Sequence, residues 1–287
     1  MLIGQDKLQK RIIRLVENHK FPRFSIIVGP TGCGKKTMAG FIVRELQKQD
    51  YVNVYSCPDT KVDTIREITK NAYKVTSTTV YIIPDADSMS GAARNALLKV
   101  TEEPPNKAYF IMTLEDENYT LATIRSRGTI FKVYPYKPEE IAQYLECRYT
   151  DAFDSGMGVI IAEVCSTPGE VDMFVRMGAE AFYKYVRLVV DNIAEVSVAN
   201  AFKIPSKVAL KEGSDAPYDL KLFWKTFQRI CLEIVLVSEP SKASKYAKAI
   251  LVTDEYIQKL QIRSINKQAL MDIWILDVRH ALEAEIE

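Results

Sequence analysis

Residues 24–37 read FSIIVGPTGCGKKT, an apolar run followed by a glycine-rich turn and the start of a helical pattern. Polyphosphate binding needs backbone N–H groups that point inward, the positive end of a helix dipole and a lysine ammonium. This stretch has the spacing of a phosphate-binding loop and predicts one; a glycine-rich turn without a ligand is the alternative. The candidate nucleotide-binding residues are Gly29, Thr31, Gly32, Cys33, Gly34, Lys35, Lys36 and Thr37.

The rest of the first half alternates between short apolar runs and stretches of helical spacing. After residue 28, we expect strands at 52–55, 80–83, 109–112 and 130–133, with helices at 37–49, 62–74 and 91–102 between them. Alternation of this kind predicts an α/β domain with a parallel sheet that is covered by helices on both faces.

The pattern becomes helical after about residue 135. We expect helices at 138–148, 159–164 and 169–177, and then a helical region with polar interruptions at 211–217 and 240–244. The predicted organisation is a nucleotide-binding domain at 1–135, a small helical lid at 136–178 and a C-terminal all-α collar domain at 179–287.

Two positions argue against a complete magnesium site. The residue after the loop lysine normally offers a hydroxyl to Mg²⁺, but here it is Lys36. Thr37 follows it, although one step along a helix turns a side chain by about 100°. In the strand expected beside the loop, the first position after the apolar run is Pro84, and Asp85 stands where a water-activating glutamate is expected. Asp85 and Asp87 as loop acids or helix caps are the alternative.

Composition narrows the class of protein. The chain has 287 residues, 47% hydrophobic and 26% charged, which is enough apolar material for a sizeable core. Its 38 basic and 37 acidic residues give a net charge of +1, which excludes a chain held to nucleic acid or membrane by its overall charge. Five cysteines without a CxxC pair indicate neither a disulfide framework nor zinc. Without a signal segment or bilayer-length apolar run, we expect a cytoplasmic protein and no membrane partner.

Three segments resemble the clamp-loader subunits of the AAA+ family. Residues 84–105 read PDADSMSGAARNALLKVTEEPP and are similar to a clamp-loader segment with PDAD, NALLK and EEPP in that order. Residues 123–127 resemble the TIRSRC segment, although Gly128 replaces its cysteine, and residues 3–5 resemble the family's IGQ opening. Because a proline precedes Asp85, this segment most resembles the corresponding segment of the delta-prime subunit of the bacterial DNA polymerase III clamp loader.

The resemblance implies an AAA+ P-loop fold and membership of a five-subunit ring that places a sliding clamp on primer-template DNA. The implied partners are clamp-loader subunits of the gamma/tau and delta types, the clamp and DNA. Arg127 matches the arginine that reaches into a neighbour's ATP site as an arginine finger, with Arg125 the weaker candidate and surface charges the alternative. Asp85 corresponds to a degenerate Walker B acid.

Other family features depart from the pattern. A lid arginine is expected after a small-Pro-Gly turn, but Glu170 follows Thr167-Pro168-Gly169 and would repel phosphate. The residue that senses the γ-phosphate should fall within 113–115. The zinc module of some delta-prime subunits is absent, because Cys57 stands alone in that region. We therefore expect ATP or ADP as a possible ligand, Mg²⁺ as a doubtful one and zinc not at all.

These features favour a delta-prime-like subunit that binds nucleotide weakly or not at all, has no intrinsic ATPase and completes a neighbour's site through Arg127. The alternatives are a catalytically active ATPase of the gamma/tau type and a nucleotide-binding adaptor outside replication. Arg94 and the lysines at 242, 245 and 248 are candidate DNA contacts, with solvated surface charges as the default.

Overall fold

The computed structural model describes residues 3–150, 155–210, 215–260, 262 and 264–283. The chain divides into two compact units, one of residues 1–144 with 167–169 and the other of residues 145–166 with 170–287. The three-domain organisation expected from the sequence stays a prediction. Within the described residues, no helix is both long and apolar enough to cross a bilayer.

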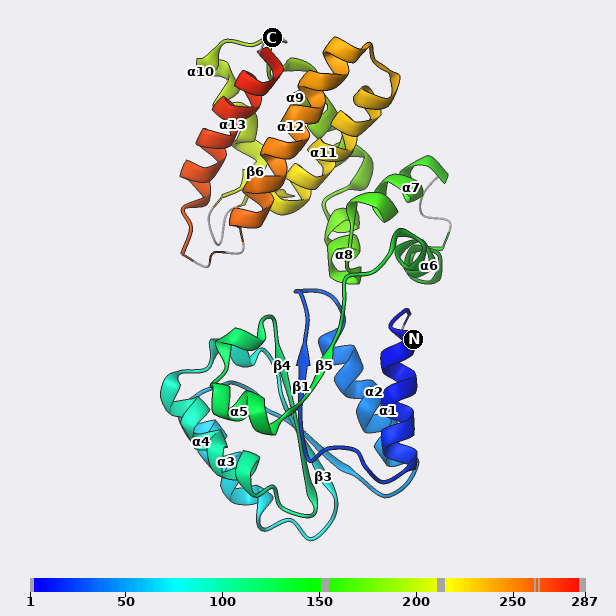
Figure 1. The fold of residues 1–287 in the computed structure, drawn as a ribbon, viewed down its shortest axis with the longest axis vertical. Coiled ribbons are helices and arrows are strands. Elements are labelled where there is room, and N and C mark those ends of the chain that lie inside the picture. The colour runs from blue at the N-terminus through cyan, green and yellow to red at the C-terminus, as the bar shows by residue number, and fades with distance from the viewer. Residues whose placement is uncertain (1–2, 151–154, 211–214, 261, 263, 284–287) are drawn as a thin grey trace. The chain divides into compact units, whose positions relative to one another are not determined.

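The first unit is built on a five-stranded parallel sheet, as the sequence predicted (Figure 1). Its order is β2-β3-β4-β1-β5. The strand that carries the acidic segment is therefore not the direct neighbour of the strand before the loop, contrary to expectation, because β4 lies between them. The strands are β1 (Phe24–Val28), β2 (Asn53–Ser56), β3 (Thr79–Ile83), β4 (Ala108–Leu114) and β5 (Thr129–Lys132).

Helices cover both faces of this sheet, with α1 and α2 on one side and α3 and α4 on the other (Figure 1). Successive side chains of a strand point to opposite faces of the sheet, so each strand contributes to the hydrophobic core on both faces. Ile26, for example, belongs to the cluster formed with α3 and α4. The helical elements of this part are α1 (Asp6–Glu17), α2 (Lys35–Gln47), α3 (Val62–Ala72), η1 (Ala86–Ser88), α4 (Gly91–Glu102), η2 (Glu117–Tyr119), α5 (Ala122–Arg127) and α6 (Pro138–Arg148).

The second unit is mainly helical, and both tryptophans lie in its core. Trp224 and Trp274 are fully buried, with ring centroids 5.8 Å apart, and Phe227 packs edge-on against Trp274. Its helices are α7 (Ser155–Val164), α8 (Pro168–Arg176), α9 (Ala179–Asn192), α10 (Val198–Ala201), η3 (Ile204–Lys207), α11 (Leu220–Val237), α12 (Pro240–Lys259) and α13 (Lys267–Glu283).

Two sequence expectations for this unit are wrong. The interruption expected at residues 240–244 is part of α12, because Pro240 occupies the first turn, where proline costs no hydrogen bond. A short parallel pair, β6 (Val208–Ala209) with β7 (Tyr218–Asp219), occurs in the region expected to be all helical. Strands of two residues carry no detectable periodicity. Part of the expected interruption at 211–217 lies outside the described residues.

Candidate nucleotide-binding site

The phosphate-binding loop joins β1 to α2 as the sequence predicted. Gly32 and Gly34 have φ values of 77° and 88°, a left-handed backbone that glycine adopts without steric cost. The helix α2 begins at Lys35, immediately after Gly34. The first N–H groups of an α-helix have no partner within it, so the loop end presents donors and positive dipole to an anion. This backbone fits a bound phosphate.

Lys35 holds its ammonium over the loop itself. The side chain is buried, and its Nζ donates to the carbonyl oxygens of Gly29 at 2.7 Å and Pro30 at 3.1 Å. The neighbouring Cys33 is also buried, and burial raises the pKa of its thiol. The loop thus holds the lysine side chain against its own backbone carbonyls, an arrangement suited to an anionic ligand.

Lys36 and Asp85 form an ion pair at the place where a divalent cation would be expected. The Lys36 Nζ lies 2.7 Å from Asp85 Oδ2, and both side chains are exposed. Asp85 has a left-handed backbone with φ of 50°, and its N–H donates to the buried hydroxyl of Thr113 at 3.0 Å. Thr37 is exposed one position along the helix. The Lys36 ammonium and the Asp85 carboxylate therefore neutralise each other. This pair of side chains does not fit Mg²⁺.

Asp87 has a structural role. It is buried, and its carboxylate accepts the N–H groups of Glu115, at 2.9 and 3.0 Å, and of Asp116 at 3.4 Å. It therefore anchors the loop that follows β4. Glu115 in turn accepts a hydrogen bond from the hydroxyl of Thr31 in the phosphate-binding loop. The segment expected to sense the γ-phosphate is thus connected to the loop by side chains.

The turn at residues 167–169 packs directly on the phosphate-binding loop. The N–H of Gly169 donates to the carbonyl of Gly32 at 3.0 Å. A Cβ added at Gly169 would lie 2.6 Å from the Gly32 Cα, so only glycine permits this approach. Tyr136 supports the loop from a second direction by donating its hydroxyl to the Cys33 carbonyl at 3.1 Å, and burial raises its pKa to about 12.

Glu170 is neutralised inside the helical unit. Its carboxylate lies 2.8 Å from Lys221 Nζ and 2.7 Å from Lys225 Nζ, and it accepts the N–H of Ser166 at 2.8 Å. Burial opposes ionisation, but the two ammonium groups and the hydrogen bonds outweigh it and lower the pKa of Glu170 to about 2. The repulsion of phosphate by Glu170 stays a prediction, while the structure shows that its carboxylate is paired with two lysines.

The two candidate finger arginines are held at the end of α5. Arg127 donates to the Thr123 carbonyl at 3.1 Å, and its Nη2 lies 3.2 Å from a carboxylate oxygen of Glu102. Its side chain remains 38% exposed. Arg125 donates to the Asn118 side-chain oxygen at 3.1 Å. Arg94 donates twice to the Met89 carbonyl, at 2.9 and 3.1 Å, which gives it a structural role in the turn before α4.

Comparison with known proteins finds similarity over part of the chain. The family model described as "DNA polymerase III, delta subunit" matches residues 58–137. The DNA polymerase III subunit gamma of Buchnera aphidicola is 30% identical over 171 residues, and the replication factor C small subunit of Sulfolobus acidocaldarius is 25% identical over 153. Part of the chain is therefore similar to subunits of these replication proteins. Each of these two alignments covers 50% of this chain and 47% of the relative, so the chain spans about half the length of the relatives it matches.

The fold is similar to that of solved structures. A mutant of the RuvB protein of Thermotoga maritima superimposes with a TM-score of 0.51 over 94% of this chain and 89% of its own, at 16% identity. At that identity the likeness concerns the AAA+ P-loop fold alone. The segment matched by the clamp-loader family model contains Asp85 and Arg127, whereas the phosphate-binding loop precedes it.

Three contacts around the phosphate-binding loop and the N-terminal segment were not predicted from the sequence. These are the support of the loop by Tyr136, the bond between Thr31 and Glu115, and the docking of Gln5, which donates to the Tyr134 carbonyl at 2.8 Å. No local pattern marks such contacts, because each joins residues 84 or more positions apart. Among the described residues, no cluster of three or more His, Cys, Asp or Glu side chains could hold a metal ion.

Proposed function

We propose that this chain is a delta-prime-like subunit of the DNA polymerase III clamp loader, which helps to load the sliding clamp onto primed DNA. The observation that carries the proposal is the ion pair between Lys36 and Asp85. In an active P-loop ATPase, the corresponding positions hold Mg²⁺ and orient the attacking water. An ammonium at the first position repels a divalent cation and engages the carboxylate at the second.

The phosphate-binding loop is proposed to bind ATP or ADP weakly or not at all, without hydrolysing it. Gly32, Gly34 and Lys35 keep the backbone and charge that a phosphate needs. The missing metal ligands remove the main means of stabilising charge on the transferred phosphoryl group. Bound nucleotide would then act as a structural ligand. We further propose that residues 1–135, 136–178 and 179–287 serve as the nucleotide-binding domain, lid and collar.

Arg127 is proposed to act in trans, as an arginine finger for the ATP site of a neighbouring subunit. Its exposed guanidinium is held by a single carboxylate, that of Glu102, and by one backbone carbonyl. A partly exposed ion pair of this kind contributes roughly 1 kcal/mol or less, so a neighbour's triphosphate could replace it. The partners of the chain would be gamma/tau and delta subunits, the clamp and primer-template DNA, in the cytoplasm.

The test is ATP turnover in a complex reconstituted from this full chain and its clamp-loader partners. Arg127→Ala should leave assembly intact and slow the one site it completes, by about 10³-fold in comparable phosphoryl-transfer systems. The ATP turnover of the whole complex should then fall by the fraction that this one site contributes. Glu102→Gln is the matched control, since it releases the arginine without removing it and should preserve turnover.

Two outcomes contradict the proposal. Unchanged turnover with Arg127→Ala would exclude the finger role. ATP hydrolysis by the isolated chain that Lys35→Ala abolishes would instead identify an active ATPase of the gamma/tau type, with Thr37 and Asp85 serving the metal.

A further inference from the structure

The helix α1 carries a row of basic side chains on its outer face. Lys7, Lys10, Arg11 and Arg14 follow the spacing i, i+3, i+4 and i+7. At 100° per residue they fall within an arc of about 100°, centred roughly opposite the buried face of the helix. That buried face carries Ile12 and Val16, which are 0% and 3% exposed.

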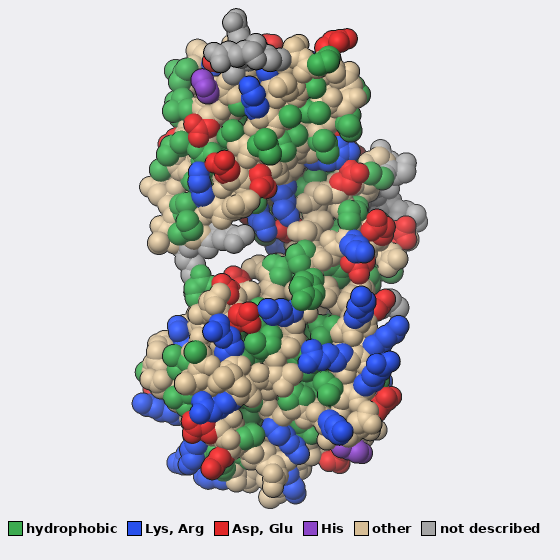
Figure 2. Space-filling model, in the orientation of Figure 1, with side chains coloured by type: hydrophobic (Ala, Val, Ile, Leu, Met, Phe, Trp, Pro, Cys, Tyr) green, Lys and Arg blue, Asp and Glu red, His purple; other side chains and the backbone are tan. Residues whose placement is uncertain are grey.

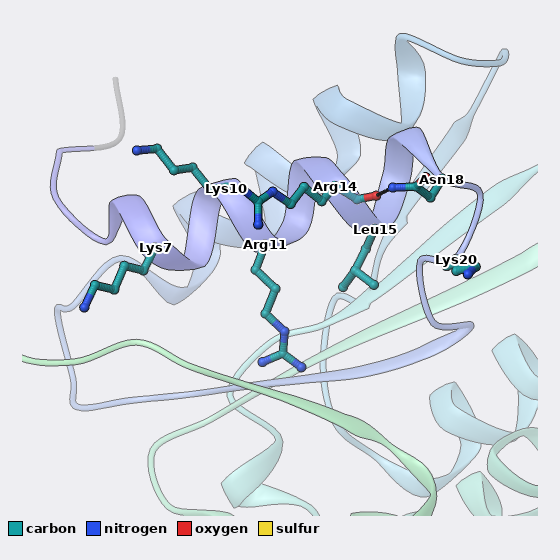
Figure 3. Close-up of a pocket in the computed structure, with 7 residues that line it drawn as sticks. All are labelled: Lys7, Lys10, Arg11, Arg14, Leu15, Asn18 and Lys20. Atoms are coloured by element: carbon teal, nitrogen blue, oxygen red, sulfur yellow. Dashed lines mark hydrogen bonds between the residues drawn. The ribbon is translucent and has the colours of Figure 1, made fainter.

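The turn after α1 adds a fifth positive charge. His19 adopts a left-handed backbone with φ of 54°, and the N–H of Lys20 donates to the Leu15 carbonyl at 2.8 Å. This six-residue hydrogen bond is that of a Schellman turn, which folds the chain back at the end of a helix. The result is a hollow of about 580 Å³ (Figure 3). Its lining is Lys7, Lys10, Arg11, Arg14, Leu15, Asn18 and Lys20.

The five positive charges are not used in ion pairs within the part of the chain that the structure describes. All five side chains are exposed, and none forms an ion pair within 4.0 Å with a carboxylate of the described residues. Other cations of the protein do form such pairs, as Lys225 does with Glu170. In a chain of net charge +1, such a concentration on one helix creates a local positive field.

Arg11 has a fixed direction within this basic face. It extends from α1 toward the sheet (Figure 3), and its guanidinium carbon lies 5.2 Å from the centre of the Phe131 ring. That ring is itself stacked on Phe21, with centroids 5.8 Å apart and planes within 8°. Stacking restricts the arginine before any ligand arrives, which reduces the entropy lost on binding.

We infer that the basic face of α1 binds the backbone phosphates of double-stranded nucleic acid. From Lys7 to Arg14 the helix advances by about 10 Å at 1.5 Å per residue. Each strand of a duplex presents about one phosphate per 3.4 Å of axis, so about three phosphates per strand pass this face. Contacts to backbone phosphates carry no sequence information, so we expect this binding to be independent of base sequence.

Two other polyanions fit the face less well. A membrane-surface helix inserts its apolar face into the lipid, but Ile12 and Val16 are buried against the domain. Sites for single strands combine cations with exposed aromatic side chains that stack on bases, and no aromatic residue lines this hollow. The inference does not depend on the proposed nucleotide role, since it uses none of the loop residues.

The test is fluorescence anisotropy of a labelled 20-base-pair duplex titrated with the full chain, without nucleotide, at several salt concentrations. The double variant Lys10→Gln, Arg14→Gln should bind at least tenfold more weakly and reduce the slope of log affinity against log salt by about 2. The double variant Lys70→Gln, Lys74→Gln removes the same charge from exposed positions in and just after α3 and should bind as the unaltered chain does.

The inference is overturned if the duplex does not bind, or if the two double variants lose affinity equally. It is also overturned if a single strand of the same length, or vesicles containing phosphatidylserine, bind more tightly than the duplex. Since all four substituted side chains are exposed, circular dichroism melting should confirm that both variants remain folded. Failure here would leave the arginine-finger test unaffected, because the latter measures turnover at another site.

Discussion

The ammonium of Lys36 lies 2.7 Å from the carboxylate of Asp85, although the residues follow different strands, β1 and β3. Lys36 occupies the position from which a P-loop ATPase offers a hydroxyl to Mg²⁺, and Asp85 occupies the position of the residue that activates water. The residue that replaces a metal ligand is thus paired with the carboxylate expected to activate water. We expect the loop to retain a phosphate without holding a divalent cation.

Nucleotide affinity should therefore be nearly independent of magnesium. Titration of a fluorescent ATP analogue should give dissociation constants in Mg²⁺ and in EDTA that agree within about twofold. Lys36→Ser restores a hydroxyl and frees Asp85, so this variant should bind at least fivefold more tightly with Mg²⁺ than without it. Lys48→Ser is the control, because Lys48 pairs with Glu45 at the far end of α2. A strong magnesium requirement in the unaltered chain would contradict this account.

The contact between Gly169 and Gly32 should make the first unit intolerant of a methyl group. In Gly169→Ala the new Cβ would lie 2.6 Å from the Gly32 Cα, and the turn must move. We expect a loss of about 1–3 kcal/mol in the free energy of unfolding, as for overpacked cores. Gly40→Ala is the matched control, since its Cβ meets nothing within 4 Å and alanine favours the helix. Equal calorimetric melting temperatures for the two variants would refute the contact's importance.

Glu170 should make the helical unit sensitive to acid. Its pKa is about 2 in the folded chain against an ordinary value of 4.5. A lowered folded pKa stabilises the protein above about pH 4.5, and the contribution disappears as pH falls toward 2. The shift corresponds to on the order of 3 kcal/mol. Glu170→Gln should therefore be less stable near pH 7, with a difference that shrinks on acidification.

Urea denaturation followed by tryptophan fluorescence measures this effect, because Trp224 and Trp274 both lie in the helical unit. Glu180→Gln is the control, since its ion pair with Lys184 is mostly exposed and should change stability little. A Glu170→Gln difference that stays constant from pH 7 to pH 3 would show that the carboxylate's charge is not responsible.

The core of the helical unit offers a comparison of two buried threonines. Thr253 accepts the indole N–H of Trp274 at 3.1 Å, so Thr253→Val strands a buried donor and should cost about 1–3 kcal/mol. Thr226 is equally buried, but its hydroxyl has no partner among the described residues. Thr226→Val should therefore be neutral or stabilising. Equal destabilisation of the two variants in urea denaturation would show that lost volume or shape, rather than hydrogen bonding, decides stability here.

Much of the fold was predictable because its signals are local. The strand at residues 24–28 and the helix from Gly91 to Glu102 were predicted with the bounds that the structure has, whereas the helix expected to begin at residue 37 begins at Lys35. The prolines at 104 and 105 end that helix because they cannot continue its hydrogen bonding. The order of the strands in the sheet could not be predicted in this way, because β4 lies between β1 and β3 although it follows both in the sequence.

The sequence by itself determined the phosphate-binding loop, the parallel sheet and the absence of the usual metal ligands at Lys36 and Pro84, since residue type and spacing express these directly. Only the tertiary structure determined which groups the side chains of Lys36 and Glu170 contact. It paired Lys36 with Asp85 and placed Glu170 between Lys221 and Lys225. The physical reason is that a charge is compensated by whichever group the folded chain brings within about 4 Å, and such partners stand 49 to 55 positions apart.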